Sequence, residues 1–339
     1  MLLDAKKRVL LTFMAAVMAT LPAKAEPAPH TGYLLVHFTS EVADGEQIYF
    51  STSTDGLHWR DLNDSRPVLV SDIGEKGVRD PAIVRSANGD KFYILATDLR
   101  IESGKGWDAA VHRGSTSLII FESTDLLNWS APRKVDIAGG IPGAGCAWAP
   151  EAIYDDSTGE YIVYWATTSP LNGIDKARIY YSTTRDFVSF TPARLYIDRP
   201  GKADIIDTQI VKMDDSAGGY KYYRASGDGQ ITLEGSQKIL GEWTTIGDLR
   251  SVGLTGKQVE GPILYKFNGT DQWALWVDQY AAGKGYLSLV SSDLSRAENF
   301  RILSPAEYSM GKSKKRHGSI LSVSAREYQA LQSKWGPSR

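Results

Sequence analysis

The chain has 339 residues, of which 42% are hydrophobic and 23% are charged, and its formal net charge at pH 7 is −2. A chain of this length can bury a large core within one domain. The nearly balanced charge lacks the basic excess of nucleic-acid-binding proteins, so we expect no nucleic-acid partner. The single cysteine, Cys146, leaves no intramolecular disulfide to form, so we expect a fold held by packing and a small, buried thiol.

The N-terminal segment predicts export. A basic stretch at residues 6–8 precedes an apolar run at residues 9–21, and Ala23-Lys24-Ala25 follows it. This pattern is typical of a secretory signal peptide, and the apolar run is short for a membrane span. We therefore expect residues 1–25 to be a signal peptide, residues 26–31 a flexible leader and residues 32–339 a single domain. After cleavage the protein would be free of the membrane, in the periplasm or outside the cell.

Short alternating segments follow and predict β-strands. Tyr33–Phe38 and Gln47–Ser51 come first, and Lys91–Ala96, Glu160–Trp165 and Gln272–Val277 each follow a turn rich in Gly, Asn, Asp, Ser or Thr. Runs of β-branched and aromatic residues after such turns are typical of strands in hairpins. Helical patterns are nearly absent, and only residues 324–333 read as a short helix. The pattern favours an all-β fold.

A longer repeat indicates how these strands are organised. At intervals of more than 50 residues, a polar or charged residue stands just before a short apolar run. The five copies are Arg79-Asp80-Pro81, Trp148-Ala149-Pro150-Glu151, Ile206-Asp207, Glu260-Gly261-Pro262 and His317-Gly318-Ser319. A second repeated element, a turn followed by an aromatic residue, occurs at Ser53–Trp59 and Ser123–Trp129. Repeats of this kind predict a five-bladed β-propeller, with one blade per repeat.

The two ends of the chain predict how the ring closes. The fifth motif, at His317, leaves room for one strand before the C-terminal segment, whereas Tyr33–Phe38 and Gln47–Ser51 are surplus to the other blades. We therefore expect the N-terminal strands and the C-terminal inner strand to form the fifth blade together. A closed ring of this kind protects the strand edges.

Three carboxylates in these motifs are the candidate catalytic residues. Because the innermost strands of a propeller converge on its axis, Asp80, Asp207 and Glu260 would meet in one pocket, as an acid/base hydrolase requires. Glu260 stands among apolar neighbours, where a carboxylate is costly unless it is paired or functional. Asp80 and Asp207 could instead be turn residues. Glu151 is the competing candidate for the acid or base.

Other residues are candidates for binding a substrate. Trp148 can supply an aromatic wall, Asp98 at the end of a strand can bind hydroxyl groups, and His317 should point into the central channel. The longest repeat contains an insertion, Arg100–Ser115, that includes Trp107. This insertion either forms the rim of the pocket or is a plain surface loop.

In this order, the five motifs resemble glycoside hydrolase family 43, and the likeness runs from about Tyr33 to Val323. The sequence around Gly45–Phe50 and Gly77–Pro81 is similar to that of the arabinofuranosidase-like branches of the family, some of which act on galactofuranose. One departure is that the family's base usually sits close to the mature N-terminus, whereas Asp80 lies well inside the chain. The surplus N-terminal strands account for this difference.

The resemblance implies a five-bladed propeller that acts as an inverting glycosidase on a carbohydrate substrate. It implies that Asp80 is the general base, Asp207 orients and tunes the acid, and Glu260 is the general acid. In similar proteins the residue matching His317 holds a water or a metal ion, often calcium, and no cofactor is required. We therefore expect an exo-acting enzyme that removes terminal furanosides, with arabinofuranose ahead of galactofuranose.

Two alternatives stay open at this point. A retaining fructan- or sucrose-type hydrolase would carry a Trp-Met-Asn-Asp-Pro-like start and a second β-sandwich, and this chain has neither pattern. A non-catalytic, sugar-binding propeller would be indicated by the loss of one of the three carboxylates, and all three are present.

Overall fold

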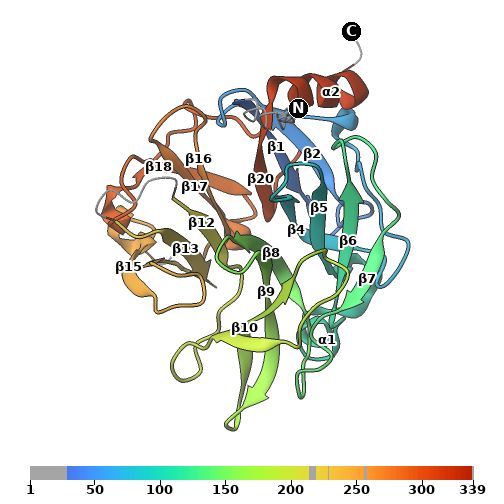
Figure 1. The fold of residues 1–339 in the computed structure, drawn as a ribbon, viewed down its shortest axis with the longest axis vertical. Helices are drawn as coiled ribbons and strands as arrows, with labels where there is room; N and C mark the ends of the chain where they lie inside the picture. The colour runs from blue at the N-terminus through green and yellow to red at the C-terminus, as the bar shows by residue number, and fades with distance from the viewer. Residues whose placement is uncertain (1–28, 214–218, 228, 256–257, 338–339) are drawn as a thin grey trace, which may run out of the picture.

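Five four-stranded antiparallel sheets surround a central axis in the computed structural model, so the predicted five-bladed β-propeller is confirmed (Figure 1). The structure describes residues 29–213, 219–227, 229–255 and 258–337. The predicted signal peptide, residues 1–25, lies outside the described residues. Strand β1 begins at His30, two residues before the predicted start of the domain. No helix in the described ranges is long and apolar enough to cross a membrane.

Four of the sheets are each built from one continuous stretch of chain and are named here from the innermost strand outward. The first sheet consists of β4 (Val78–Arg85), β5 (Phe92–Asp98), β6 (Ser117–Ser123) and β7 (Arg133–Asp136). The second consists of β8 (Trp148–Asp155), β9 (Glu160–Leu171), β10 (Ile174–Thr184) and β11 (Arg194–Ile197). The third sheet consists of β12 (Gln209–Lys212), β13 (Tyr222–Gly227), β14 (Ile231–Ser236) and β15 (Thr244–Asp248). The fourth consists of β16 (Glu260–Lys266), β17 (Trp273–Asp278), β18 (Tyr286–Ser291) and β19 (Arg301–Ile302).

The remaining sheet joins the two ends of the chain. Its strand order is β20 (Gly318–Ser324), β1 (His30–His37), β2 (Tyr49–Ser53) and β3 (Arg60–Asp61). Strand β1 pairs with β20 in antiparallel register, with Leu34 opposite Leu321 and Leu35 opposite Ile320. The predicted closure of the ring is therefore confirmed. The C-terminal inner strand is hydrogen-bonded to an N-terminal strand, as each inner strand of the other sheets is to its neighbour.

Buried apolar side chains fill the space between neighbouring blades. Leu34, Val36 and Phe50 of the closing blade pack in one cluster with Ile94 and Ile119 of the next blade. The alternation of side chains along each strand sends one set of residues to each neighbouring blade, so every sheet contributes to two clusters. The core is therefore divided among the blade interfaces, and the ring axis is left to the polar ends of the inner strands.

The repeated turns fix where the outer strands begin. The carboxylate of Asp55 accepts hydrogen bonds from the backbone N–H groups of Leu57 and His58, both at 2.8 Å, and the indole N–H of Trp59 donates to the Gly56 carbonyl at 3.0 Å. The turn at Asp125 repeats this arrangement with Trp129. Aspartate side chains that accept from the following backbone amides are a standard way to stabilise a tight turn.

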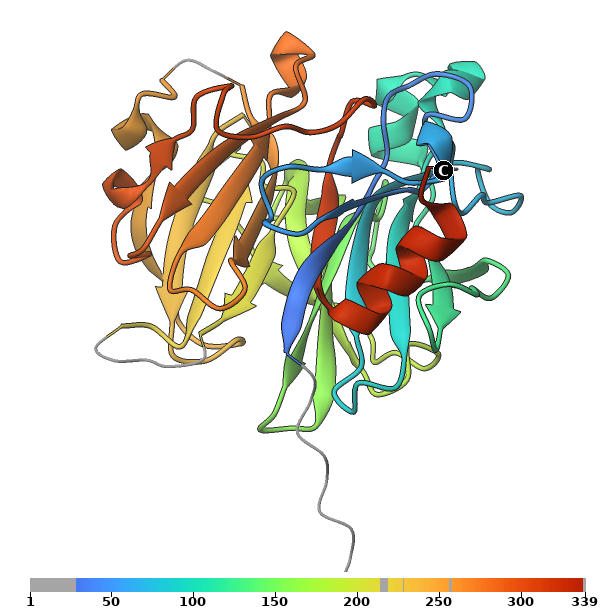
Figure 2. The ribbon, with the colours of Figure 1, turned by 90° about the horizontal axis from the view of Figure 1, so that it is seen from above.

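The helical elements are short. They are η1 (Asn63–Ser65), η2 (Ile101–Lys105), α1 (Trp107–Arg113), η3 (Leu249–Val252), η4 (Tyr280–Ala282), η5 (Ala297–Asn299) and α2 (Ala325–Trp335). Three of them, η2, α1 and η4, contribute a residue to the site described below. The predicted C-terminal helix is confirmed as α2, which begins with a Ser324–Glu327 capping box and packs on β1 and β20 (Figure 2). Helix α1 was not predicted, because seven residues are too few to show a helical period.

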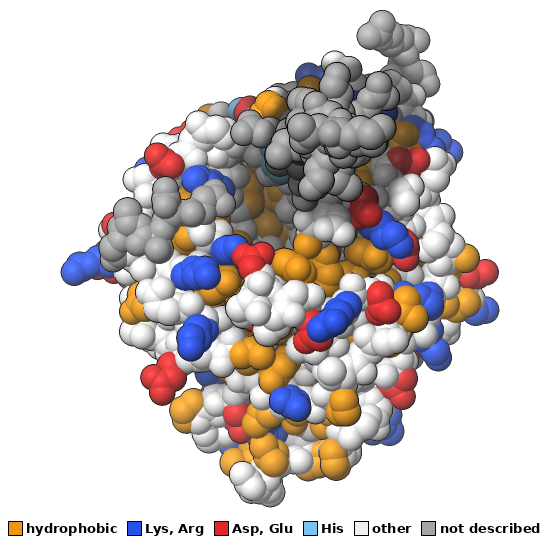
Figure 3. All heavy atoms as spheres, viewed as in Figure 1, with side chains coloured by type: hydrophobic (Ala, Val, Ile, Leu, Met, Phe, Trp, Pro, Cys, Tyr) orange, Lys and Arg blue, Asp and Glu red, His pale blue; other side chains and the backbone are white. Residues whose placement is uncertain are grey.

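Charged side chains of both signs are interspersed over the face of the molecule in Figure 3, in keeping with the nearly balanced net charge. Among the described residues visible in this view, no extended patch of one sign appears.

Candidate active site

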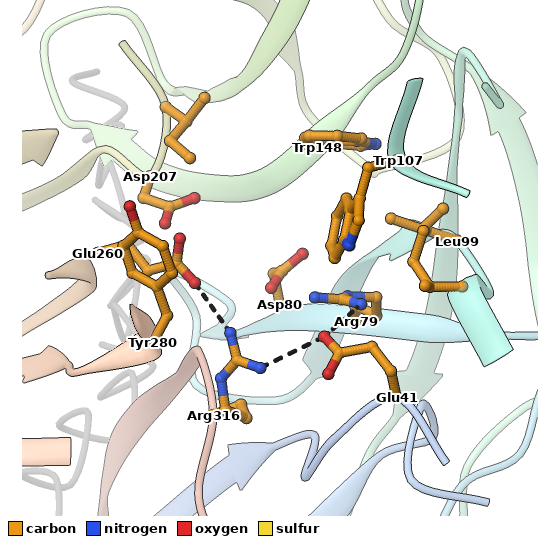
Figure 4. A pocket seen from close by; sticks show the side chains of 12 residues that line it. Glu41, Arg79, Asp80, Leu99, Trp107, Trp148, Asp207, Glu260, Tyr280 and Arg316 are labelled. Atoms are coloured by element: carbon orange, nitrogen blue, oxygen red, sulfur yellow. Dashed lines mark hydrogen bonds and ion pairs between the residues drawn. The ribbon is translucent and has the colours of Figure 1, made fainter. Parts of the chain in front are cut away.

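A cavity of about 530 Å³ lies where inner strands from different blades begin, which is within the usual size range of small-molecule sites (Figure 4). The predicted Asp80, Asp207 and Glu260 all line it. The full lining consists of Glu41, Arg79, Asp80, Leu99, Ile101, Trp107, Trp148, Ile206, Asp207, Glu260, Tyr280 and Arg316. The structure thus brings together three carboxylates that are far apart in the sequence.

Backbone geometry directs the side chains at the start of each inner strand. Asp80, Ala149 and Asp207 have φ values of 48°, 47° and 47°, and Gly261 has 54°, so equivalent positions of four blades are left-handed. At three of these positions the strand ladder is interrupted by a register shift. A bulge in a strand turns a side chain away from its regular direction. Aspartate tolerates this conformation better than most residues, but it still costs free energy, which is typical of functional positions.

Glu260 does not occupy the same backbone position in its blade as the two aspartates occupy in theirs. Asp80 and Asp207 occupy the left-handed position itself, whereas Glu260 stands one residue earlier and Gly261 takes the left-handed position. A β-carbon on Gly261 would lie 2.9 Å from Cγ of His317, so glycine is required for close approach as well as for its φ angle. The longer glutamate side chain therefore reaches the cavity from a different backbone position.

Asp80 is held by a hydroxyl group from the neighbouring strand. The Thr97 hydroxyl donates to Oδ2 of Asp80 at 3.0 Å, and the backbone N–H of Ala149 donates to the same hydroxyl oxygen at 2.8 Å. The chain of hydrogen bonds links the first two inner strands. It fixes one carboxylate oxygen of Asp80, and Figure 4 shows the carboxylate facing the middle of the cavity.

Asp207 is tied to the backbone beside Glu260. The N–H of Gly261 donates to Oδ2 of Asp207 at 2.9 Å. Figure 4 shows the two carboxyl groups close together on one wall of the cavity. Asp207 is therefore placed to orient the segment that carries Glu260 and to act on its ionisation.

The surroundings of Glu260 favour its protonated form. Burial is the largest cause that raises its pKa above the ordinary range, and the negative charges of Asp207 and Asp278 raise it further. The guanidinium of Arg316 acts in the opposite direction, since its Nη2 lies 2.9 Å from Oε1 of Glu260. The same guanidinium is already paired with Asp278 and with Glu41, so its positive charge is shared among several carboxylates.

His317 lies beside the two aspartates. Its Nδ1 is 3.5 Å from Oδ1 of Asp207 and 3.6 Å from Oδ1 of Asp80, and burial lowers its pKa. Its Nδ1 makes no hydrogen bond to the described residues. No group of three or more His, Cys, Asp or Glu side chains in the described ranges is arranged to hold a metal ion, so a calcium ion near His317 stays a prediction without a ligand set.

Trp148 lies in the cavity wall, as expected, but Asp98 does not line the cavity. The buried Asp98 carboxylate accepts from the backbone N–H of Glu75 at 2.7 Å and from the Ser115 hydroxyl at 2.7 Å. Its position at a strand end suggested contact with sugar hydroxyls, and the structure gives it protein partners instead. Glu151 lines a separate opening, and burial raises its pKa to about 8.

Several lining residues were not predicted as site residues. Arg79 and Arg316 each stand directly before a predicted site residue, so the motif alone could have identified them. Glu41 lies in a loop and Tyr280 begins η4, both outside any repeated motif, and no sequence signal marks them. Glu41 joins the two arginines, since its Oε1 lies 3.0 Å from Nη1 of Arg79 and 3.3 Å from Nη1 of Arg316.

A family model described as a probable glycosyl hydrolase domain, related to family 43, matches residues 28–329. The chain belongs to the family 43-related glycosyl hydrolases. This membership confirms the resemblance noted in the five motifs and the expectation of a glycosidase. It also agrees with the five-bladed architecture, because the motifs that carry the resemblance are the starts of the inner strands.

The chain is similar to characterised proteins of this group. It is 34% identical over 297 residues to an α-L-arabinofuranosidase of Bifidobacterium longum subsp. longum, which covers 76% of this chain and 27% of that protein. The chain therefore spans about a quarter of the length of that relative. Solved structures with a similar fold include a thermostable family-43 glycoside hydrolase (18% identity, TM-score 0.48, covering 70% and 75% of the two chains). Another is the endo-arabinanase of Bacillus licheniformis (20% identity, TM-score 0.46, covering 75% and 82%).

Proposed function

We propose that this protein is an exo-acting glycoside hydrolase that removes terminal furanosides with inversion of configuration, with α-L-arabinofuranosides as the first candidate and β-D-galactofuranosides as the second. The observation that carries the proposal is the meeting of Asp80, Asp207 and Glu260 in one cavity. The similarity to an α-L-arabinofuranosidase supports the choice of sugar. The predicted export would bring the enzyme to a polysaccharide outside the cytoplasm.

Glu260 is proposed as the general acid. Hydrolysis of a glycoside requires a carboxylic acid that still carries its proton near neutral pH, so that it can protonate the departing oxygen. Burial and the neighbouring carboxylates favour that form of Glu260. As the bond between the anomeric carbon and this oxygen breaks, the proton moves from Glu260 to the leaving group, and Arg316 is placed to stabilise the carboxylate that remains.

Asp80 is proposed as the general base. It comes from a different blade than Glu260, so the two carboxyl groups face the cavity from separate inner strands. In an inverting enzyme the two groups stand ~6.5–9.5 Å apart, which leaves room for the attacking water. The base takes a proton from this water while its oxygen bonds to the anomeric carbon on the face opposite the leaving group. Asp207 orients Glu260 and keeps it protonated.

The test is a hydrolysis screen with the purified protein. Substrates are the 4-nitrophenyl glycosides of α-L-arabinofuranose, β-D-xylopyranose, β-D-galactofuranose and β-D-fructofuranose, and the Asp80→Asn variant is the blank, because 4-nitrophenolate can leave without a general acid but the attacking water still needs a base. We expect turnover of a furanoside that the variant loses, and NMR of the first product should show the inverted anomer. A retained anomer would contradict the mechanism. If the protein hydrolyses neither these substrates nor matching oligosaccharides but still binds the sugar, a sugar-binding propeller would be favoured.

A further inference from the structure

An exposed tryptophan faces the cavity from the insertion between β5 and β6. Trp107 has 49% of its surface exposed, and it is the one large apolar side chain with this exposure that lines the cavity within the described part of the chain. Exposing an indole to water is unfavourable, because its apolar surface is large. An aromatic ring kept in this position is better explained by a ligand than by packing.

The insertion is fixed at its start by a buried carboxylate. Glu46, which is 2% exposed, accepts hydrogen bonds from the backbone N–H groups of Ile101 and Glu102, both at 2.9 Å. The same carboxylate pairs with Arg79 at 3.0 Å. Because Arg79 also lines the cavity, Glu46 links the insertion to the cavity wall.

The end of the insertion is fixed in the same manner. The Ser115 hydroxyl donates to the buried Asp98, and the N–H of Gly114 donates to the carbonyl of Gly145 at 2.7 Å. A β-carbon on Gly145 would lie 2.2 Å from the carbonyl oxygen of Val111, so α1 packs directly against the neighbouring loop. With both ends held, the position of Trp107 is defined by the fold before any ligand binds.

The indole has defined neighbours within the cavity. Its ring lies edge-on to Trp148, with centroids 6.1 Å apart and an interplanar angle of 81°, and the guanidinium of Arg79 lies 5.1 Å from its centroid. Figure 4 shows Trp107 and Trp148 on the side of the cavity opposite Glu260 and Tyr280. Two rings at nearly right angles form a corner, which can contact both a ring face and an edge of a bound sugar.

We propose that Trp107 is a substrate-binding residue whose indole packs against the apolar C–H face of the sugar ring held in the cavity. This inference rests on the proposed function and assigns a binding role to the insertion. Stacking of this kind contributes to binding the substrate before and during the reaction alike. Removing the indole should therefore raise KM more than it lowers kcat.

The test compares Trp107→Ala and Trp107→Phe with the wild type on the glycoside that the wild type hydrolyses best. We expect Trp107→Ala to raise KM about tenfold with kcat within about threefold, as is usual when an aromatic ring no longer packs against a ligand. Trp107→Phe keeps an aromatic face and should restore most of the affinity. The matched control is Leu240→Ala, which removes a side chain of similar exposure (45%) outside the cavity and should leave both constants unchanged.

Two results would overturn the inference. One is a wild-type KM in Trp107→Ala. The other is an equal fall in kcat, with a lower melting temperature, in both Trp107 variants, which would indicate a structural role. If the wild type hydrolyses no glycoside, the proposed function fails separately. Calorimetric titration of wild type and Trp107→Ala with an arabino-oligosaccharide then decides the inference, since equal affinity or no binding overturns it and weaker binding by the variant supports it.

Discussion

The guanidinium Nη2 of Arg316 lies 2.9 Å from Oε1 of Glu260, so an arginine contacts the carboxyl group that is expected to stay protonated. An arginine alone would favour the ionised form. Arg316, however, also pairs with Asp278 through Nε and with Glu41 through Nη1. Because these carboxylates balance its charge, Arg316 can donate a hydrogen bond to the neutral Glu260 and hold it in position without ionising it.

Glu41→Gln tests this balance. Removing the negative charge beside Arg316 strengthens its positive field at Glu260, which lowers the pKa of the acid. The acid is active only below its pKa, so the alkaline limb of the pH profile of kcat/KM should move to lower pH, by about one unit for a charge within this range. The pH profile is measured between about pH 5 and pH 10, so that the alkaline limb can be followed.

The control for this variant is Glu122→Gln, which removes a carboxylate that pairs with Lys91 outside the cavity and should leave the limb in place. An alkaline limb in Glu41→Gln that stays at its wild-type position would show that Glu41 has no influence on the acid. A shift of the limb to higher pH would show that removing the Glu41 charge raises the pKa of Glu260, which contradicts the prediction.

The Glu260→Gln variant should be more stable than the wild type at alkaline pH. The pKa of Glu260 is higher in the folded than in the unfolded state, so its protonation favours folding at low pH and this contribution is lost as the pH rises through the folded pKa. Gln cannot ionise and avoids that loss. We expect the advantage of the variant in free energy of unfolding to grow by about 3–5 kcal/mol from about pH 5 to pH 9, because the stability of the wild type falls by ~1.4 kcal/mol for each pH unit between the unfolded and the folded pKa of Glu260.

Chemical denaturation of both proteins at the two pH values measures this difference. Glu151, whose pKa burial raises to about 8, has the same sign of pH dependence but is present in both proteins and cancels in the comparison. A constant difference between variant and wild type across this range would mean that Glu260 does not change its ionisation on folding.

Asp80→Asn should abolish hydrolysis of every substrate, because no other group would take the proton from the attacking water. General base catalysis contributes ~10²–10⁴-fold, so a loss of this size is expected. Azide needs no base and can enter from the side of the water. A β-linked glycosyl azide formed from an α-linked substrate, identified by NMR, would support Asp80 as the base, and activity close to that of the wild type would exclude it.

Gly261→Ala separates backbone strain from a clash in the site. Gly261 and Gly269 both have positive φ, at 54° and 70°, but only at Gly261 would a new β-carbon lie 2.9 Å from His317, whereas nothing lies within 4 Å at Gly269. Each alanine should cost ~1 kcal/mol of stability for its conformation. Only Gly261→Ala should also reduce kcat, because it displaces the imidazole beside the aspartates.

Denaturation and steady-state kinetics on both glycine variants provide the comparison. If Gly269→Ala loses as much activity as Gly261→Ala, the activity loss has a general cause and not a local one.

Cys146 should not react with thiol reagents in the folded protein. Its side chain is buried, and burial raises its pKa to about 11, so very little thiolate forms at neutral pH. Titration with a colourimetric disulfide reagent should give no reaction without denaturant and one thiol per chain in denaturant. A fast reaction in the native state would show that the thiol is accessible.

The main features of the fold follow from local patterns. The turns at Asp55 and Asp125 and the strand segments are set by neighbouring residues, so the sequence shows them directly. Helix α1 was missed because it is short. Asp98 was assigned to the wrong neighbours, because the end of a strand can face either a ligand or another part of the chain, and only the position of Ser115 distinguishes the two.

The sequence by itself determined that five repeats form five blades, and therefore that Asp80, Asp207 and Glu260 approach one axis. This follows because each repeat starts an inner strand, and inner strands of a closed ring must converge. Only the tertiary structure decided the burial that raises the pKa of Glu260, the pairing of Arg316 with Glu41 and the placing of Trp107 in the cavity. These properties depend on burial and on charges brought together from distant loops, and neither is contained in a local pattern.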